Sequence, residues 1–323
     1  MTSKYEMFDR SRLTIQPLGK RIHDVTVSDV LEIGDEPMKL DSEAELRKVA
    51  DAVNAARARG ASVVLMMGAH LIKVGLSRYL VDLIRRGIFS VVAMNGACSI
   101  HDYEMARIGA TSESVAKYIM EGRFGLWQET AAINDILRAG VADGLGYGEA
   151  LGKAVSQSDL PHKDLSIFAA CYEAGIPATV HVGVGYDIIH EHPNCDGAAL
   201  GAASYRDFLV FTKVIESLEG GAVLCYGTAV MGPEVYLKAL SMARNVAARQ
   251  GRQIRRFTSA VFDLVHLGSD LTTEAPKDQP EYYYRPFKTV LVRTVRDGGT
   301  SHYVRGDHRA TLPALHRLIV AGR

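Results

Sequence analysis

The stretch Ser62-Val-Val-Leu-Met-Met-Gly-Ala-His70 decides the fold of this chain. Its apolar run ends at Gly68, and a continuous apolar run bounded by glycine is typical of a strand buried on both faces of a parallel sheet. The pattern that follows predicts a helix over 71–86, which ends before Gly87, and a second buried strand over 89–94. Strand, helix and strand in this order form a βαβ unit, and such units build parallel sheets.

The rest of the chain continues this alternation. Further strands are predicted over 177–182, 222–226, 256–265 and 289–295, and further helices over 42–59, 111–120, 130–137, 166–173, 205–216, 233–240 and 312–321. We therefore predict an α/β protein with a doubly wound, mostly parallel sheet and helices on both faces. Residues 1–40 are interpreted as an N-terminal arm. Residues 41–323 are interpreted as a single domain, since large α/β folds often run past about 200 residues as one unit.

Composition excludes several classes of function. The 323 residues contain 37 Lys plus Arg and 37 Asp plus Glu, so there is no net charge to attract nucleic acid or an anionic membrane. The 4 cysteines are far apart and form no CxxC pair, which is typical of a reducing compartment. Neither an apolar signal core nor a stretch able to span a bilayer is present in the sequence. We expect a soluble cytoplasmic protein.

The segment Asn95-Gly-Ala-Cys-Ser-Ile-His-Asp-Tyr-Glu104 directly follows the predicted strand over 89–94. It supplies a carboxamide, a thiol, a hydroxyl, an imidazole and two carboxylates within a short span. Ligands bind just past the carboxyl ends of strands in open α/β sheets, so the segment predicts one wall of a small-molecule site. His101 with Asp102 or Glu104 is a candidate acid–base pair. The alternative is that the acidic residues cap the following helix.

Glycines mark the ends of several predicted strands, in Gly68-Ala69-His70, Asn95-Gly96-Ala97, His181 to Asp187 and Gly227-Thr228-Ala229. Glycine lets a ligand approach the backbone, and the N–H groups of a following helix suit phosphate. This combination suits a dinucleotide, although neither GxGxxG opening a helix nor GxxxxGK[ST] occurs. Ordinary strand-to-helix turns are the alternative interpretation.

A second polar cluster, Asp187-Ile-Ile-His190-Glu-His192-Pro-Asn-Cys195, offers a carboxylate, two imidazoles and a thiol at short spacing. Zinc would accept three of these groups and keep an open position. The spacing does not fit one face of a helix, and on a strand only His190 and His192 share a side. The cluster is therefore either a metal site built on Asp187, His190 and His192 or a polar loop at the sheet edge.

The segment Tyr282-Tyr-Tyr-Arg-Pro-Phe-Lys288 surrounds a lysine with aromatic rings. Such a lysine can be desolvated and nucleophilic near neutral pH, and an aromatic cluster can also enclose a cationic ligand. The alternative is a loop anchored by buried rings, with Lys288 directed to water.

Several segments, taken in order from about residue 60 to residue 320, resemble the deoxyhypusine synthase superfamily. They are Met67-Gly-Ala-His-Leu-Ile-Lys-Val-Gly-Leu-Ser-Arg-Tyr-Leu80, Asn95-Gly-Ala97 with Asp102 and Glu104, Gly175-Ile-Pro177 with Gly185-Tyr-Asp187, Tyr226-Gly-Thr-Ala-Val-Met231, and Lys288. The resemblance implies a Rossmann-like NAD-binding fold and a homotetramer with active sites between subunits. It also implies transfer of an aminobutyl group from spermidine to an acceptor amine, which can be a small polyamine in bacterial relatives. In this reaction NAD oxidises the amine to an imine, a lysine traps the butyl group and 1,3-diaminopropane leaves.

The resemblance also implies roles for individual residues. Asp187 would bind the amine and Lys288 would be the attacking lysine, while Tyr186, Glu234 and Asp263 are expected near the substrate. The nucleotide is expected to contact Gly68, Ala69, His70, Asn95, Gly96, Ala97, Asp102, Gly227 and Thr228. The chain departs from the family at Val182, where an aspartate is expected, at Pro233 or Glu234, where a histidine is expected, and at Pro286, where a tryptophan is expected. A metal-dependent enzyme and a non-catalytic nucleotide-binding scaffold are therefore kept as alternatives.

Overall fold

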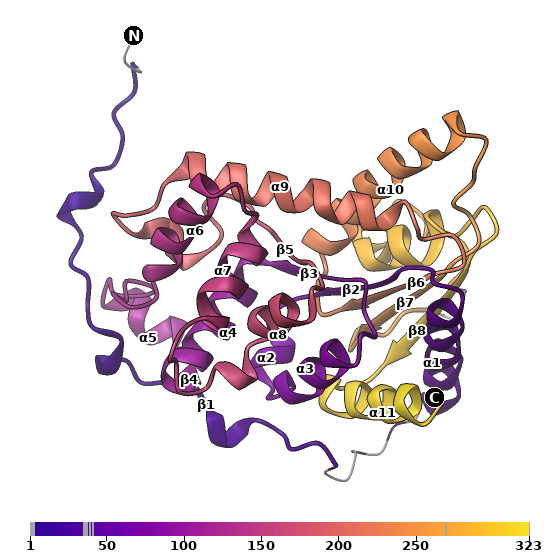
Figure 1. The fold of residues 1–323 in the computed structure, drawn as a ribbon, viewed down its shortest axis with the longest axis horizontal. Helices are drawn as coiled ribbons and strands as arrows, with labels where there is room; N and C mark the ends of the chain where they lie inside the picture. Colours follow the sequence, from indigo (N-terminus) through magenta and orange to yellow (C-terminus); the bar gives the residue numbers. More distant parts are fainter. Residues whose placement is uncertain (1–3, 35–37, 39, 41, 269, 323) are drawn as a thin grey trace.

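A six-stranded parallel sheet forms the centre of the computed structural model, which describes residues 4–34, 38, 40, 42–268 and 270–322. Its strands lie in the order β5-β3-β2-β6-β7-β8, and each neighbouring pair is parallel (Figure 1). The strands are β2 (Val63–Met67), β3 (Val91–Asn95), β5 (Ala178–His181), β6 (Ala222–Tyr226), β7 (Thr258–Asp263) and β8 (Thr300–Arg305). In chain order these six strands read 3-2-1-4-5-6, the order of a doubly wound Rossmann sheet. The predicted fold class is confirmed.

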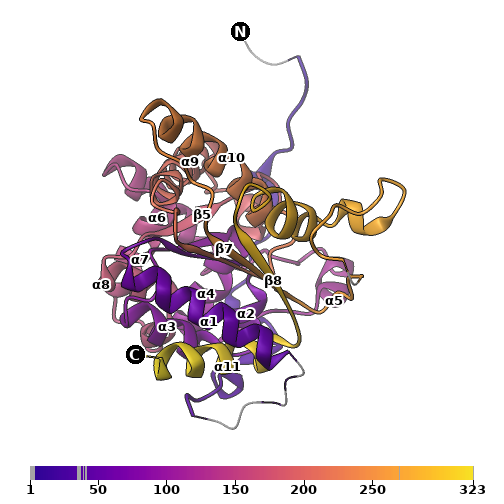
Figure 2. The same ribbon diagram turned by 90° about the vertical axis from the view of Figure 1, so that its right-hand side faces the viewer.

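Helices cover both faces of the sheet (Figures 1 and 2). Side chains of β2 alternate between the faces: Val63, Leu65 and Met67 belong to one buried cluster, and Val64 and Met66 belong to the other. The first cluster includes residues of α1 (Glu43–Ala58), α3 (Ser77–Arg85), α4 (Gly96–Ile108), α7 (Tyr147–Ser156), α8 (Ile167–Ala174) and α11 (His308–Ala321). The second includes residues of α9 (Gly197–Ile215), α10 (Met231–Arg249) and the π-helical segment η7 (Pro286–Arg293). None of the helices in the described part of the chain is long and apolar enough to cross a membrane.

The predicted strand over 289–295 is wrong, because these residues lie mostly within η7. Phe287, Val290 and Leu291 are buried against the second face of the sheet, and their spacing suits one side of a helix. A short apolar run does not distinguish a strand from a buried helix by periodicity alone. The last strand of the sheet is β8 instead. It was not predicted because Thr300-Ser-His-Tyr-Val-Arg305 is mostly polar, as suits a strand at the sheet edge.

The helix predicted over 71–86 is two helices, α2 (His70–Lys73) and α3. Gly75 separates them. Its φ of +79° is a backbone conformation that residues with a side chain rarely adopt. A Cβ atom at Gly75 would also lie 2.1 Å from the carbonyl oxygen of Asp29. The break in the helix therefore lets the N-terminal arm pack closely against it.

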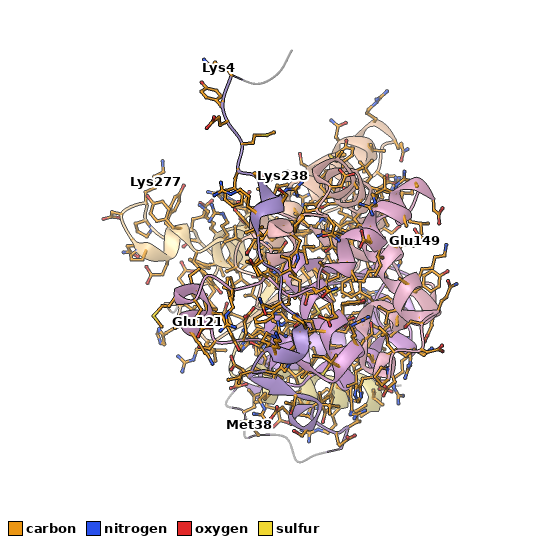
Figure 3. All side chains as sticks on the ribbon, turned by 90° about the vertical axis from the view of Figure 1, so that its left-hand side faces the viewer. Lys4, Met38, Glu121, Glu149, Lys238 and Lys277 are labelled. Carbon is orange, nitrogen blue, oxygen red and sulfur yellow. The ribbon has the colours of Figure 1, made fainter. Side chains whose placement is uncertain are left out.

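The N-terminal arm runs over the outside of the domain, and the residues near Lys4 extend away from it (Figure 3). Its short strand β1 (Val25–Thr26) pairs with β4 (Ala110–Thr111), and Gln16 forms a single bridge with Trp127. Leu18 packs with Tyr118 of α5 (Val115–Met120) and with Trp127 in a small separate core. These contacts tie the arm to the segments that follow β3.

Candidate functional site

A cavity of about 250 Å³ lies where β3 and β5 end. We call it the acidic cavity. Of the residues predicted from the sequence, five line it together: Ala97, His101, Glu104, Tyr186 and Asp187. Arg21, Lys73 and Glu113 were not predicted and also line it. The full lining is Arg21, Lys73, Ala97, Ile100, His101, Glu104, Ser112, Glu113, Val115, Phe124, Tyr186, Asp187 and Ile188. Neighbouring parallel strands bring these distant segments to one edge of the sheet, as the strand-end rule predicts.

Gly96 determines where the Asp187 carboxylate lies. Helix α4 begins at Gly96, and its N-cap residue Asn95 accepts a hydrogen bond from the Cys98 N–H at 3.3 Å through Oδ1. A Cβ atom at Gly96 would lie 1.9 Å from Oδ2 of Asp187, so only glycine leaves room for the carboxylate there. The first turn of a helix has unpaired N–H groups and a dipole that favours negative charge. The predicted Asn95-Gly96 turn thus positions Asp187 against the start of α4.

Asp187 is nearly buried and lacks a strong cationic partner. Its side chain is 9% exposed, and this burial raises its pKa to about 6. Within the described part of the chain, its ion-pair contact is with His190, whose Nε2 lies 3.9 Å from Oδ2. A carboxylate with a raised pKa in a cavity is a candidate for binding a cation or taking up a proton.

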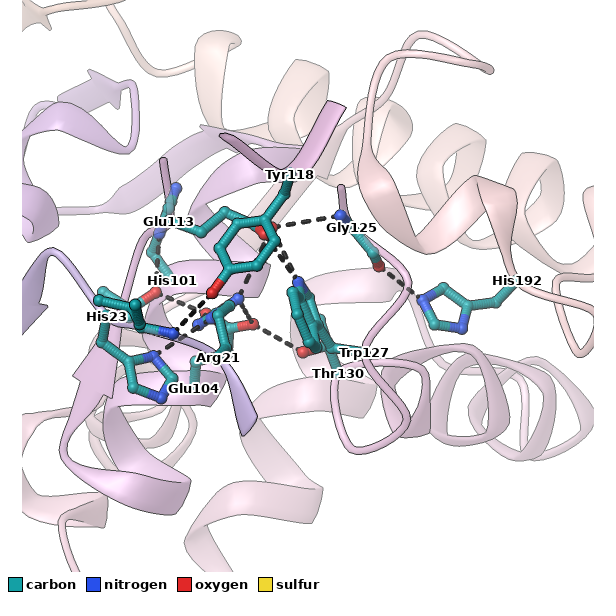
Figure 4. A network of polar contacts seen from close by, with 12 residues as sticks. Arg21, His23, His101, Glu104, Glu113, Tyr118, Gly125, Trp127, Thr130 and His192 are labelled. Atoms are coloured by element: carbon teal, nitrogen blue, oxygen red, sulfur yellow. Dashed lines mark hydrogen bonds and ion pairs between the residues drawn. The ribbon is translucent and has the colours of Figure 1, made fainter. Parts of the chain in front are cut away.

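Glu104, in the same cavity wall, is the centre of a buried hydrogen-bond network that we call the Arg21–Glu104 network (Figure 4). Arg21 donates through both terminal nitrogens to the two carboxylate oxygens, at 2.9 and 2.6 Å. The hydroxyls of Thr111 and Thr130 donate to the same carboxylate, at 2.7 and 2.6 Å. Both charged side chains are 1% exposed. Glu104 is therefore a buried anion whose hydrogen-bonding capacity is already used.

The same network fixes the tautomer of His101. Thr111 donates its only hydroxyl hydrogen to Glu104, so its oxygen must accept from Nδ1 of His101, 2.8 Å away. Burial lowers the pKa of His101 to about 4, which keeps the ring neutral at pH 7. The ring therefore carries its hydrogen on Nδ1 and leaves Nε2 as a hydrogen-bond acceptor. His101 is connected to Glu104 through Thr111, and the acid–base pair stays a prediction.

Asp102 does not cap the helix after β3, and its place near a nucleotide stays a prediction. Its carboxylate accepts from the Ser166 hydroxyl at 2.5 Å and from the Ile167 N–H at 2.7 Å. It thus caps the start of α8, a helix distant in sequence. Asp102 is 1% exposed, and burial raises its pKa to about 7. Its position inside α4 turns it away from the cavity that its neighbour His101 lines.

Glu113 is a further carboxylate in the lining of the acidic cavity, and Glu191 lies near Glu113 but outside that lining. Glu113 accepts from Nε1 of Trp127 at 2.9 Å and from the Gly125 N–H at 3.2 Å, and burial raises its pKa. The pKa of Glu191 is raised to about 6, first by burial and then by the nearby charge of Glu113. Cationic ligands would be favoured in this surrounding.

The predicted metal site on Asp187, His190 and His192 is not formed. Nε2 of His192 lies 2.9 Å from the carbonyl oxygen of Gly125, so this ring nitrogen is already engaged (Figure 4). Among the residues that the structure describes, no group of three His, Cys, Asp or Glu side chains is placed to hold a metal ion. The cluster is better described as the polar loop that was the alternative interpretation.

The glycine turns after β2 and β6 meet at the point where the strand order reverses. The Gly68 N–H donates to the carbonyl of Tyr226 at 3.0 Å, and a Cβ atom at Gly68 would lie 2.2 Å from the carbonyl oxygen of Gly227. Ala69 and His70 follow on one side, and Thr228 follows on the other, where its hydroxyl accepts from the Gly232 N–H at 3.0 Å. Dinucleotides bind at this switch point in Rossmann sheets.

The C-terminal residues predicted for the site lie over the other half of the sheet. Lys288, on η7, has its Nζ 4.4 Å from the centre of the Tyr282 ring, so the predicted aromatic contact is present. Glu234 accepts from Nε of Arg285 at 2.8 Å, and Asp263 accepts from the Tyr284 hydroxyl at 2.5 Å. Since η7 packs against β7 and β8, one chain does not bring Lys288 to Asp187 at the ends of β3 and β5.

Known proteins resemble this chain in fold, and not detectably in sequence. No family model and no curated protein sequence matches the chain. The arginine dihydrolase ArgZ of cyanobacteria superposes with a TM-score of 0.52 at 15% identity, over 88% of this chain and 32% of ArgZ. AgrE, solved with ornithine and NAD+, gives 0.53 at 15% identity over 89% and 34%. A putative LOR/SDH protein from Methanococcus maripaludis S2 gives 0.50 at 15% identity over 92% and 73%.

These similarities define the chain as an α/β protein with a Rossmann-like fold. The chain spans about a third of the length of ArgZ and AgrE. At this level of identity the fold is what is shared, so membership of the deoxyhypusine synthase superfamily stays a prediction from the sequence.

Proposed function

We propose that the protein is an NAD-dependent enzyme that acts on an amine bound in the acidic cavity. One observation carries this proposal: Asp187 is a nearly buried carboxylate in the cavity wall, with no Lys or Arg in ion-pair contact among the described residues. Three carboxylates and two cationic side chains line the cavity, and the charge of Arg21 is committed to Glu104. An ammonium group is the ligand that this charge pattern favours.

NAD is supported by the turns at the switch point. Gly68 and Gly227 form tight turns packed against each other at the switch point, which is where Rossmann proteins bind the pyrophosphate of a dinucleotide. Asn95, at the end of the strand next to β2, offers a carboxamide where Rossmann proteins commonly bind a ribose hydroxyl. AgrE, which shares the fold, was solved with NAD+. When bound, NAD would supply a hydride acceptor for the carbon next to the amine nitrogen.

The role of the chain itself is to bind the amine and to accept a proton. Asp187 holds the ammonium group and takes one N–H proton, which leaves a neutral amine with a free electron pair. That pair forms the C=N bond as the neighbouring carbon loses hydride, so the product is an iminium ion. Because the pKa of Asp187 is about 6, the carboxylate is charged at neutral pH and remains basic enough to accept the proton.

The finer proposal is transfer of an aminobutyl group from spermidine through Lys288. Since Lys288 lies over β7 and β8, it would reach the acidic cavity of another subunit, which requires the homotetramer with shared sites. A Lys288→Ala protein is then expected to bind spermidine normally and to lose transfer. Unchanged transfer in this variant would remove Lys288 from the reaction.

The experiment is to incubate the protein with NAD+ and spermidine, with putrescine as acceptor, and to identify small-molecule products by mass spectrometry. Release of 1,3-diaminopropane is expected, together with NADH if the imine is not reduced again. Asp187→Asn should abolish both, while Asp143→Asn, which changes an exposed aspartate, should change neither. Binding of NAD+ without turnover of spermidine, putrescine or other amines would instead support a non-catalytic scaffold.

A further inference from the structure

The His190 ring lies beside Asp187, and one of its two nitrogens has hydrogen-bond partners. His190 is in η5 (Ile188–Glu191), and its side chain is 6% exposed. Nδ1 accepts from the Gly185 N–H at 3.0 Å and from the Asp187 N–H at 3.2 Å. In the described part of the chain, buried Nε2 has no hydrogen-bond partner. Leaving a buried polar atom unpaired is unfavourable, so each such case in a folded protein calls for a physical reason.

The two backbone donors fix the tautomer of this ring. A nitrogen that accepts N–H donors carries no hydrogen, so neutral His190 has its hydrogen on Nε2. Burial lowers the pKa of His190, which keeps the ring neutral at pH 7. The unpaired atom is therefore a donor, and it lies 3.9 Å from Oδ2 of Asp187. This distance is longer than a hydrogen bond, and a small rotation of either side chain would close it in the free protein.

We propose that His190 is a positioning residue for Asp187: its Nε2–H donates to Oδ2 and directs the other carboxylate oxygen to the bound amine. This inference rests on the proposed function. The ammonium proton passes to the other carboxylate oxygen of Asp187, and His190 keeps its own hydrogen throughout. The donated hydrogen bond stabilises the charged carboxylate, so Asp187 stays ionised over a wider pH range than burial alone would allow.

Other groups around Asp187 do not supply this contact. Cys98 of α4 and Tyr147 of α7 lie near it, and burial raises the pKa of each far above neutral, so both stay uncharged. Across the acidic cavity, Arg21 and Glu104 are bonded to each other, and His101 is held through Thr111. The remaining charged groups that line the cavity are Lys73 and Glu113.

Two substitutions of His190 distinguish its two contacts: acceptance of the backbone N–H groups by Nδ1, and donation to Asp187 by Nε2. The amide oxygen of asparagine can reach the place of Nδ1, so His190→Asn keeps an acceptor for the two backbone N–H groups and removes the Nε2 donor. Glutamine reaches the place of Nε2 and restores a donor there. His266→Asn is the matched control, because His266 is exposed.

The test is NMR titration of the Asp187 carboxyl in protein with 13C-labelled aspartate, with the signal assigned by its loss in Asp187→Asn. We expect His190→Asn to raise the pKa of Asp187 by about one unit. His190→Gln should restore most of the wild-type value, and His266→Asn should leave it unchanged. An unchanged Asp187 titration in a folded His190→Asn protein would overturn the proposal. If His190→Asn fails to fold, 15N NMR of wild-type His190 decides instead, because a hydrogen on Nδ1 would also overturn it.

These measurements need no substrate, so their outcome is separable from that of the proposed function. A shifted Asp187 titration with no turnover of any amine would retain the contact and reject the reaction. Turnover of spermidine together with an unchanged titration would reject the contact and retain the reaction. With active enzyme, His190→Asn should move the acidic limb of the rate profile upward by the same shift as the Asp187 titration.

Discussion

Glu104 and Asp187 are two buried carboxylates in the wall of one cavity, and the structure surrounds them differently. Glu104 accepts four side-chain hydrogen bonds, two of them from Arg21. Asp187 has an imidazole at 3.9 Å as its ion-pair contact among the described residues, and its pKa is raised to about 6. Burial alone therefore does not identify a functional carboxylate. A carboxylate paired with an arginine and two hydroxyls belongs to the fold, and one without a Lys or Arg partner is available to a cationic ligand.

The largest expected effect on stability comes from removing Arg21, the partner of Glu104. Arg21→Met leaves a buried carboxylate without its partner, so we expect the free energy of unfolding to fall by about 3–5 kcal/mol. Replacing both Arg21 and Glu104 by Met should restore much of this loss, because no uncompensated charge remains. Urea denaturation measures both variants. Arg12→Met, in an exposed part of the same arm, is the control. A loss below about 1 kcal/mol in Arg21→Met would contradict the assignment of this pair to the fold.

Removing the Asp187 charge is expected to have the opposite effect, an increase in the free energy of unfolding. The pKa is raised from 3.8 to about 6 on folding, so the charged form is disfavoured in the folded state. The stabilisation by the protonated carboxyl is complete below pH 3.8 and is lost as pH rises to about 6. Asp187→Asn removes this penalty and should raise the free energy of unfolding at pH 7 by about 1–3 kcal/mol. Reduced stability in this variant, measured by urea denaturation, would argue for a structural role.

The smallest expected effect on stability comes from moving Asp187 without changing it. Gly96→Ala places a Cβ atom 1.9 Å from Oδ2, so the carboxylate must leave the start of α4. We expect amine turnover to be lost, while the free energy of unfolding changes by about 1 kcal/mol or less, since alanine favours helix. Gly201→Ala in α9 meets no atom within 4 Å and is the matched control, with full activity. Full activity in Gly96→Ala would show that this position of Asp187 is not needed.

The sequence predicted the parts of the site that depend on local order. Buried strands ending in glycine turns predicted that the residues after β3 and β5 would meet, and Ala97, His101, Tyr186 and Asp187 do line one cavity. Arg21 could not be predicted in the same way. It lies 83 residues from Glu104, in an arm whose path depends on packing against α5 and Trp127. The local sequence Leu18-Gly-Lys-Arg-Ile-His-Asp24 has no pattern that distinguishes this arginine from a surface residue.

The C-terminal region shows the other limit of local patterns. The aromatic contact of Lys288 follows from neighbouring residues, and it is present in the structure. Where that contact lies depends on whether 289–295 is strand or helix, and the short apolar run was compatible with both. Asp102 illustrates the same point, because its partner α8 is brought to it by tertiary packing.

The most direct test of the comparison is calorimetric titration of spermidine into wild-type protein and Asp187→Asn, at pH values above and below 6. The account predicts binding by the wild type above pH 6, weaker binding below it as Asp187 is protonated, and loss of binding in Asp187→Asn at both pH values. Equal binding by wild type and Asp187→Asn would contradict the assignment of Asp187 as the carboxylate that receives the ligand.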